Sequence, residues 1–157
     1  MIEQLYIFFT LEMVYLWLNL GVLPFWFILI FFPQSQISKI FVTSIFPIFI
    51  LCLSYIYLFY IAYSGDYDFL QNFKLYLGFE EIINLFENSY FLIMFWVHFL
   101  AMNLFCGGWI VKDSQMFRIN KFIVSIPLLI TYLIGPIGIF VYWIIRLFYA
   151  KRISLYE

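Results

Sequence analysis

The chain has 157 residues, of which 66% are hydrophobic, 25% aromatic and only 11% charged, and its formal net charge is −1. A soluble domain carries roughly 25% charged residues. The composition excludes a soluble globular fold, because too few polar side chains remain to cover a water-facing surface. The near-zero net charge also excludes a basic footprint for nucleic acid. We therefore expect an integral membrane protein.

Four apolar runs are each long enough to supply the ~20 residues that a membrane-spanning helix needs. They predict spanning helices over residues 13–32, 40–63, 90–111 and 122–149. Short polar turns join the first run to the second and the third to the fourth, and such links make neighbouring helices antiparallel. The sequence therefore predicts an all-α, polytopic membrane protein, with the single domain 1–157 folded as a four-transmembrane-helix bundle.

The connection between the second and third runs, residues 64–89, differs from the short turns. It holds five acidic residues and one lysine. Its apolar residues recur at helical spacing, at Phe79, Ile82, Ile83 and Phe86. This pattern predicts an amphipathic helix on the membrane surface between spans two and three. An ordered loop that covers the bundle is the open alternative.

Lysine and arginine in short loops favour the cytoplasmic side of a membrane. With four crossings, one side of the membrane would carry Lys74, Arg146, Lys151 and Arg152. The other side would carry Lys39, Lys112, Arg118 and Lys121. The two counts are equal, so the sequence leaves the orientation open.

Ionisable residues within a span are costly, and they point to function. Three such residues lie in the apolar runs or at their edges: Glu12, His98 and Arg146. Histidine exchanges a proton near neutral pH, so His98 is the candidate for acid–base chemistry. Counting from the polar turn at residues 112–121, His98 lies about 21 Å deep.

The fourth run contains a Gly-Pro break at about the same depth as His98. Pro136 has no N–H, so the carbonyl of Tyr132 loses its helical partner and needs another donor. The His98 imidazole is one such donor. Gly135 and Gly138 allow a helix or a ligand to approach the backbone closely.

Two further polar residues, Asn19 and Ser54, fall near the same level. We therefore predict a mid-membrane polar layer made of Asn19, Ser54, His98 and residues 132–138. An open alternative is that His98 ties two helices together and does nothing more.

Glu12 and Arg146 both fall near the opposite membrane face, where they form either an ion pair or two separate interface anchors. Asp113 lies about 22 Å from His98 along a helix axis, so these two side chains are not expected to act on one atom.

Small and aromatic residues suggest close helix packing elsewhere. Gly107 and Gly108 permit close approach, and Trp96 and Trp109 are interpreted as packing or interface aromatics. The cysteines show no paired spacing, so no disulfide, metal or cofactor is expected.

The stretch from Trp96 to Ile110, WVHFLAMNLFCGGWI, is followed by Asp113, by the Gly-Pro-Ile-Gly run at residues 135–138 and by Arg146. This combination resembles the abscisic-acid-deficient-four-like membrane proteins of plastids and bacteria. A weaker match lies at residues 23–33. The resemblance implies an integral protein of a bacterial inner membrane or a plastid-type membrane.

The resemblance also implies a role in carotenoid metabolism. Plant members are needed to make neoxanthin from violaxanthin, in which an epoxide opens to an allenic alcohol. Such an isomerisation needs an acid and a base, and His98 is the candidate for either role. The family usually has an acid where Asn103 stands and a basic residue where Gly108 stands, so Asn103 marks a family site position. Asp113 is a further candidate.

Two other functions stay open. One is a non-catalytic scaffold or a lipid- or pigment-binding protein, which the amide at Asn103 favours. The other is a small transporter subunit, which ranks last because a pore needs polar stripes along whole helices. The expected partners are membrane lipid and a carotenoid or isoprenoid ligand, with the oligomeric state open.

Overall fold

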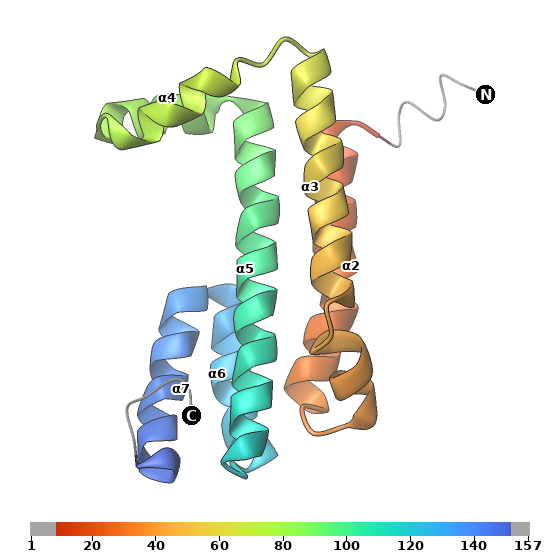
Figure 1. Ribbon diagram of the computed structural model, residues 1–157, viewed down its shortest axis with the longest axis vertical. Coiled ribbons are helices and arrows are strands. Elements are labelled where there is room, and N and C mark those ends of the chain that lie inside the picture. Colours follow the sequence, from red (N-terminus) through yellow and green to blue (C-terminus); the bar gives the residue numbers. More distant parts are fainter. Residues whose placement is uncertain (1–8, 152–157) are drawn as a thin grey trace, which may run out of the picture. The chain divides into compact units, whose positions relative to one another are not determined.

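The computed structural model describes residues 9–151, and that part of the chain is helical without a β-strand. The longer helices are α2 (Leu11–Phe31), α3 (Phe46–Ser64) and α5 (Ser89–Met116), as Figure 1 shows. The shorter ones are α4 (Phe79–Glu87), α6 (Lys121–Leu133), α7 (Gly135–Ala150), the π-helix η1 (Ser38–Val42) and the 3₁₀-helix η2 (Phe69–Tyr76). The all-α prediction is therefore confirmed.

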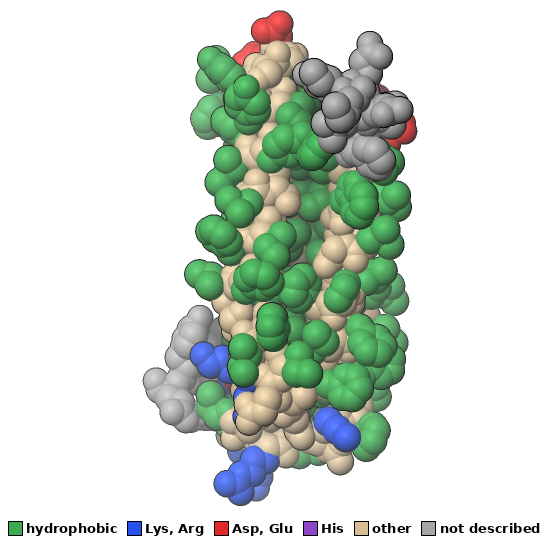
Figure 2. Space-filling model, turned by 90° about the vertical axis from the view of Figure 1, so that its right-hand side faces the viewer, with side chains coloured by type: hydrophobic (Ala, Val, Ile, Leu, Met, Phe, Trp, Pro, Cys, Tyr) green, Lys and Arg blue, Asp and Glu red, His purple; other side chains and the backbone are tan. Residues whose placement is uncertain are grey.

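Three helical segments are long and apolar enough to cross a membrane: Leu11–Phe31, Ser38–Ser64 and Ser89–Met116. They coincide with the first three predicted spans. The second segment is interrupted by a bend at residues 43–45, between η1 and α3. Pro24 lies inside α2 without ending it. Large hydrophobic side chains cover much of the face drawn in Figure 2, as a lipid-facing surface requires.

The fourth predicted span is wrong as a single helix. Its residues form α6 and α7, which pack against each other as a hairpin around Ile134 (Figure 1). Pro136 stands in the first turn of α7, where its missing N–H leaves no hydrogen bond broken. With 13 and 16 residues, neither helix reaches the ~20 residues of a full span.

Gly138 explains how closely the two helices of this hairpin approach. A Cβ atom at Gly138 would collide with the side chain and backbone of Thr131. The Thr131 hydroxyl in turn donates to the carbonyl of Pro127, 2.7 Å away in α6. At Gly138 the close approach joins the two helices of the hairpin.

The third predicted span is longer in the structure than the predicted 90–111. Helix α5 continues to Met116, so Asp113 lies in a helix and the polar turn shortens to residues 117–120. Arg118 ends the helix with a left-handed backbone, at φ 51°. The N–H of Ile119 then closes the turn on the carbonyl of Ser114, at 2.9 Å.

The long connection between α3 and α5 folds into two short helices that pack on each other, η2 and α4. Asp68 caps η2 by accepting a hydrogen bond from the N–H of Leu70, at 2.9 Å. The apolar repeat that begins at Phe79 is helical, as predicted. Its position at a membrane surface stays a prediction.

The chain divides into two compact units. The first holds residues 1–21 and 49–101, and the second holds residues 22–48 and 102–157. Among the described residues, the first unit carries six carboxylates and one lysine, Lys74. The described part of the second unit carries six lysines and arginines and one carboxylate, Asp113. The units therefore have opposite net charge, and the Lys and Arg side chains visible in Figure 2 gather in one region.

Candidate functional site

A row of polar and aromatic side chains joins α5 to α7 in the second unit. Trp109 and Asp113 near the end of α5 and Phe117 directly after it are spaced four residues apart, so they share one side. Tyr142 and Arg146 are spaced in the same way on α7. The matching intervals let each of these two α7 side chains contact two of the three side chains Trp109, Asp113 and Phe117.

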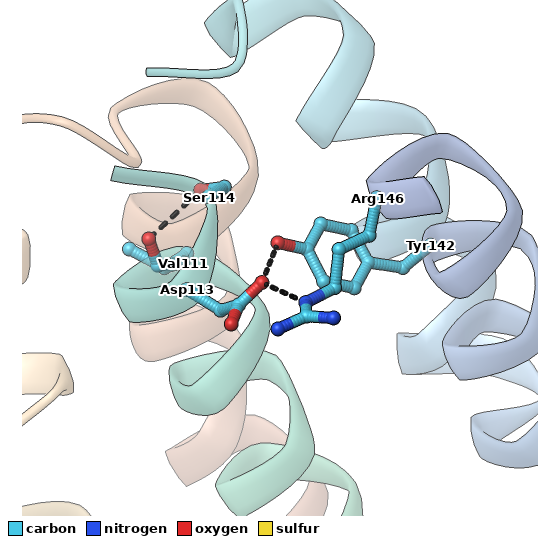
Figure 3. Close-up of polar contacts among 5 residues, drawn as sticks. All are labelled: Val111, Asp113, Ser114, Tyr142 and Arg146. Atoms are coloured by element: carbon cyan, nitrogen blue, oxygen red, sulfur yellow. Dashed lines mark hydrogen bonds and ion pairs between the residues drawn. The ribbon is translucent and has the colours of Figure 1, made fainter. Parts of the chain in front are cut away.

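Asp113 lies at the centre of this row. Its Oδ2 accepts a hydrogen bond from the hydroxyl of Tyr142 at 2.6 Å and from Nε of Arg146 at 2.8 Å (Figure 3). The Trp109 ring meets the Tyr142 ring edge-on at 5.6 Å. The guanidinium of Arg146 lies 4.9 Å from the centre of the Phe117 ring. The carboxylate thus accepts two hydrogen bonds, one of them from a cation.

The three polar side chains of this row are almost fully enclosed. Their exposed fractions are 0% for Tyr142, 3% for Arg146 and 4% for Asp113. A buried charge is tolerated only when it is paired and hydrogen-bonded, and the Asp113–Arg146 ion pair meets both conditions. Because these atoms already satisfy one another, the row is suited to fixing α7 on α5.

The sequence left Arg146 either paired with Glu12 or as a separate interface anchor, and the structure pairs it with Asp113. The reason is the hairpin: a single fourth span would have carried Arg146 to the opposite face, whereas α7 turns back toward the end of α5. Glu12 is exposed in the first turn of α2. The sequence signal that identifies the pair is the shared four-residue spacing of Trp109 with Asp113 and of Tyr142 with Arg146.

Asn103, where the family usually has an acid, is also enclosed. It is 7% exposed, and its Nδ2 has no hydrogen-bond partner among the described residues. Its side chain lies against Gly135, where a Cβ atom would collide with Asn103 Oδ1. The structure therefore brings Asn103 to the hairpin turn, a contact that the sequence interpretation did not include.

The predicted polar layer falls into separate local contacts. In the first unit, Asn19 donates to the carbonyl of Tyr15 at 2.7 Å and accepts from Trp96 Nε1 at 3.3 Å. Ser54 donates to the carbonyl of Ile50 within its own helix, at 3.0 Å. His98 is exposed on α5. The joining of these residues with 132–138 stays a prediction.

Aromatic packing in the second unit involves Trp26, which is buried and lies 5.4 Å from the ring of Tyr132. A Cβ atom at Gly107 would stand 2.9 Å from the Trp26 ring. The absence of a side chain at Gly107 therefore gives the Trp26 ring its place. At Gly108 the nearest atom would be the carbonyl oxygen of Val42, at 3.9 Å, which is ordinary contact.

An open pocket of about 780 Å³ lies in the first unit, between α2 and α5. Its walls combine aromatic, aliphatic and polar side chains, including Thr10, Glu12, Tyr15, Ser89, Leu92 and Trp96. The Tyr15 and Trp96 rings lie 5.7 Å apart, and Asn19 holds the indole by its N–H. Apolar walls with a few convergent polar groups are typical of small-molecule sites.

The orientation of α5 separates His98 from this pocket. His98 follows Trp96 by two residues, which is about 200° around an α-helix. It therefore points away from the side of α5 that lines the pocket. The pocket contains Glu12 and Tyr15, and the sequence interpretation had assigned neither of them to a ligand site.

Comparison with known proteins places the chain in a family. Residues 13–142 match the ABA DEFICIENT 4-like family. The chain is 29% identical over 123 residues to Protein ABA DEFICIENT 4, chloroplastic, from Arabidopsis thaliana, which covers 76% of this chain and 54% of that protein. It thus spans about half the length of that relative, and no solved structure matches it significantly. Because the family match extends over most of its length, the chain belongs to the ABA DEFICIENT 4-like family.

Proposed function

We propose that this protein acts within a membrane on a carotenoid or a related oxygenated isoprenoid, which it binds in the pocket between α2 and α5. The observation that carries the proposal is the pocket itself, in which the Tyr15 and Trp96 rings, tilted by 43° to each other, offer an aromatic wall. Family membership supports the substrate class. The exposed hydrophobic side chains of the three long helices support a membrane location.

The reaction that the family suggests is the opening of an epoxide to an allenic alcohol. The epoxide oxygen gains a proton as its C–O bond breaks, and the neighbouring carbon loses a proton, so substrate and product are isomers. No oxidant or reductant is needed. The pocket holds Glu12 and Tyr15, three residues apart on one side of α2. We assign Glu12 as the base that takes the proton from the neighbouring carbon. We assign Tyr15 as the side chain that donates a hydrogen bond to the epoxide oxygen.

A second candidate is a non-catalytic protein that binds a pigment or a lipid. Asn103 favours it, because an amide neither takes up nor releases a proton near neutral pH. The enclosure of Asp113 favours it as well, because a carboxylate already engaged by Tyr142 and Arg146 has little capacity for another reaction.

The two candidates differ in what they leave in the pigment pool of a xanthophyll-producing host. We would express the tagged protein, purify it in mild detergent, and separate the bound and total pigments by chromatography. Glu12→Gln keeps the shape of the side chain and removes the base. Trp96→Phe removes part of the aromatic wall, and Trp143→Phe is its control because Trp143 is exposed on α7.

We expect the parent protein and Trp143→Phe to carry pigment, and Trp96→Phe to lose about two- to tenfold of it, the range expected for one aromatic contact. A new allenic product that disappears in Glu12→Gln, while pigment stays bound, would identify the enzyme. Bound but unaltered pigment would identify the binding protein. Purified protein without pigment, in a host whose pigment pool is unchanged, would overturn both.

A further inference from the structure

A second pocket, of about 690 Å³, lies in the second unit where α2 and α5 end and α6 begins. The residues that matter here are Lys39, Arg118, Lys121, Gln34, Gln115 and Phe122. We propose that this pocket binds the phosphate group of an anionic membrane lipid. The inference is independent of the α2–α5 pocket and of any action on carotenoids.

The charge of the pocket is the first argument. Three cationic side chains line it, and no carboxylate is among the lining residues. Asp113 is the single carboxylate in the described part of this unit, and it is buried against Arg146. The three cations therefore have no acid within their described unit to neutralise them, and a phosphate is the complementary ligand.

Two hydrogen bonds link the segments that form the walls of the pocket. Gln34, in the turn after α2, donates from Nε2 to the carbonyl of Ile119 at 3.2 Å. Gln115, near the end of α5, donates from Nε2 to the carbonyl of Pro33 at 2.8 Å. These two hydrogen bonds run in opposite directions and join the turn after α2 to the end of α5 and the turn that follows it. The two hydrogen bonds therefore hold the segments that line the pocket in place.

Arg118 occupies an unfavourable backbone conformation at the edge of this pocket. Its φ of 51° is left-handed, which costs a residue other than glycine about 1 kcal/mol or more. Glycine is the usual residue at such a position after a helix. Strained backbone tends to persist where a side chain serves a ligand, and here the strain places a guanidinium in the pocket wall.

A stripe of exposed apolar side chains on α6 argues for a lipid as the source of the phosphate. The stripe begins at the pocket with Phe122 and continues with Ile126, Leu129 and Leu133, all exposed. Steps of four, three and four residues keep them on one side of the helix. From Phe122 to Leu133 the stripe is about 17 Å long, close to half of the ~30 Å hydrocarbon core. An acyl chain of one leaflet can lie along it.

The test is a titration of the detergent-purified full chain with three probes: phosphatidylglycerol, phosphatidylcholine and inorganic phosphate. Native mass spectrometry counts the bound lipid, and thermal unfolding reports stabilisation. We expect phosphatidylglycerol to bind and stabilise, and the other two probes to have little effect. Equal binding of the two lipids would overturn the proposal. Equal stabilisation by inorganic phosphate would overturn the assignment to a lipid.

Arg118→Gly is the most informative variant, because it removes the charge and relieves the backbone. We expect it to fold at least as stably as the parent and to bind phosphatidylglycerol about fivefold more weakly, the factor for one cation at an anionic lipid surface. Lys112→Ala is the control, since Lys112 is exposed in the same unit but does not line the pocket. An equal loss in both variants would show general charge attraction and overturn the built site.

Discussion

Gly107 and Gly108 are neighbours on α5, yet the structure gives them different surroundings. At Gly107 the space for a side chain is taken by the rigid, buried ring of Trp26 and by Leu29. At Gly108 the nearest atom stands at an ordinary contact distance. The pair therefore offers a matched comparison in which one added methyl group is tested in two environments.

We expect Gly107→Ala to lower the free energy of unfolding by about 1–3 kcal/mol, because the Trp26 ring must move to admit the methyl group. Gly108→Ala should be neutral or raise it by up to about 1 kcal/mol, because alanine is the better helix former. Unfolding titrations of both variants in detergent measure the difference. Equal stability of the two would contradict the close approach at Gly107.

Asp113 provides a second prediction at the level of single residues. Asp113→Ala leaves Arg146 buried without its carboxylate, which should cost about 3–5 kcal/mol. Glu12→Ala, at the residue that the sequence suggested as the partner of Arg146, should change stability little because Glu12 is exposed. Combining Asp113→Ala with Arg146→Gln in a double-mutant cycle measures the coupling. Coupling near zero would rule out the ion pair.

The 3₁₀-helix η2 carries a feature that belongs to the element and to no single residue. Leu70, Phe73 and Tyr76 are strongly exposed, and at three residues per turn they lie on one face of such a helix. An apolar face beside polar neighbours is typical of a helix that lies in the membrane interface. This supports the predicted surface position for the connection between α3 and α5, with η2 as well as α4 contributing to it.

We expect a polarity-sensitive fluorophore on Phe73→Cys to emit at shorter wavelength in liposomes than the same fluorophore on Gln71→Cys, because the first lies on the apolar face. Both variants would be built with Cys52 and Cys106 replaced by serine. The same two proteins in detergent-free denaturant serve as the control. Identical emission from the two sites in liposomes would argue against an interfacial face.

At this scale the sequence predicts the long elements and misses the hairpin. Three apolar runs form long helices, although Pro24 lies inside α2 and a bend at residues 43–45 interrupts the second run near its start. The fourth run is equally apolar, but a Gly-Pro pair is compatible with either a kink or a complete turn. The choice depends on the contacts of Gly138 with Thr131 and of Arg146 with Asp113. The spacing within one helix shows which side chains share a side, but it does not show which helix they meet. The sequence did not predict η2 for the same reason, because η2 packs against α4.

Because α6 and α7 form a hairpin, the numbers of Lys and Arg expected on the two sides of a membrane change. We predict three crossings, one for each long apolar helix, and no further crossing from a hairpin that enters and leaves on one side. The loop side that holds Lys39 and Arg118 then also holds Lys112, Lys121, Arg146 and Lys151. The opposite side holds Lys74. The equal counts of the four-span prediction become strongly unequal, and Arg152, outside the described residues, was part of that equality.

We therefore expect the side with Lys39 and Arg118 to face the cytoplasm or its organellar equivalent. In a variant without Cys52 and Cys106, a membrane-impermeant thiol reagent should label Gly78→Cys from outside intact cells and leave Gln36→Cys unlabelled. Gly78 has open space around it, and Gln36 is exposed. Lysed cells should label both, as a control. Labelling of Gln36→Cys alone in intact cells would show the opposite orientation.

The pairing of Arg146 with Asp113 also bears on how the protein is made. Arg146 lies four residues before the end of α7 and is buried, and a buried arginine without a counter-ion carries a desolvation cost of several kcal/mol. Asp113 precedes Arg146 by 33 residues, so α5 is already synthesised when α7 emerges from the ribosome. We therefore expect α7 to pack against α5 at a time when the Asp113 carboxylate is already in place, so that α5 serves as a template for the last helix.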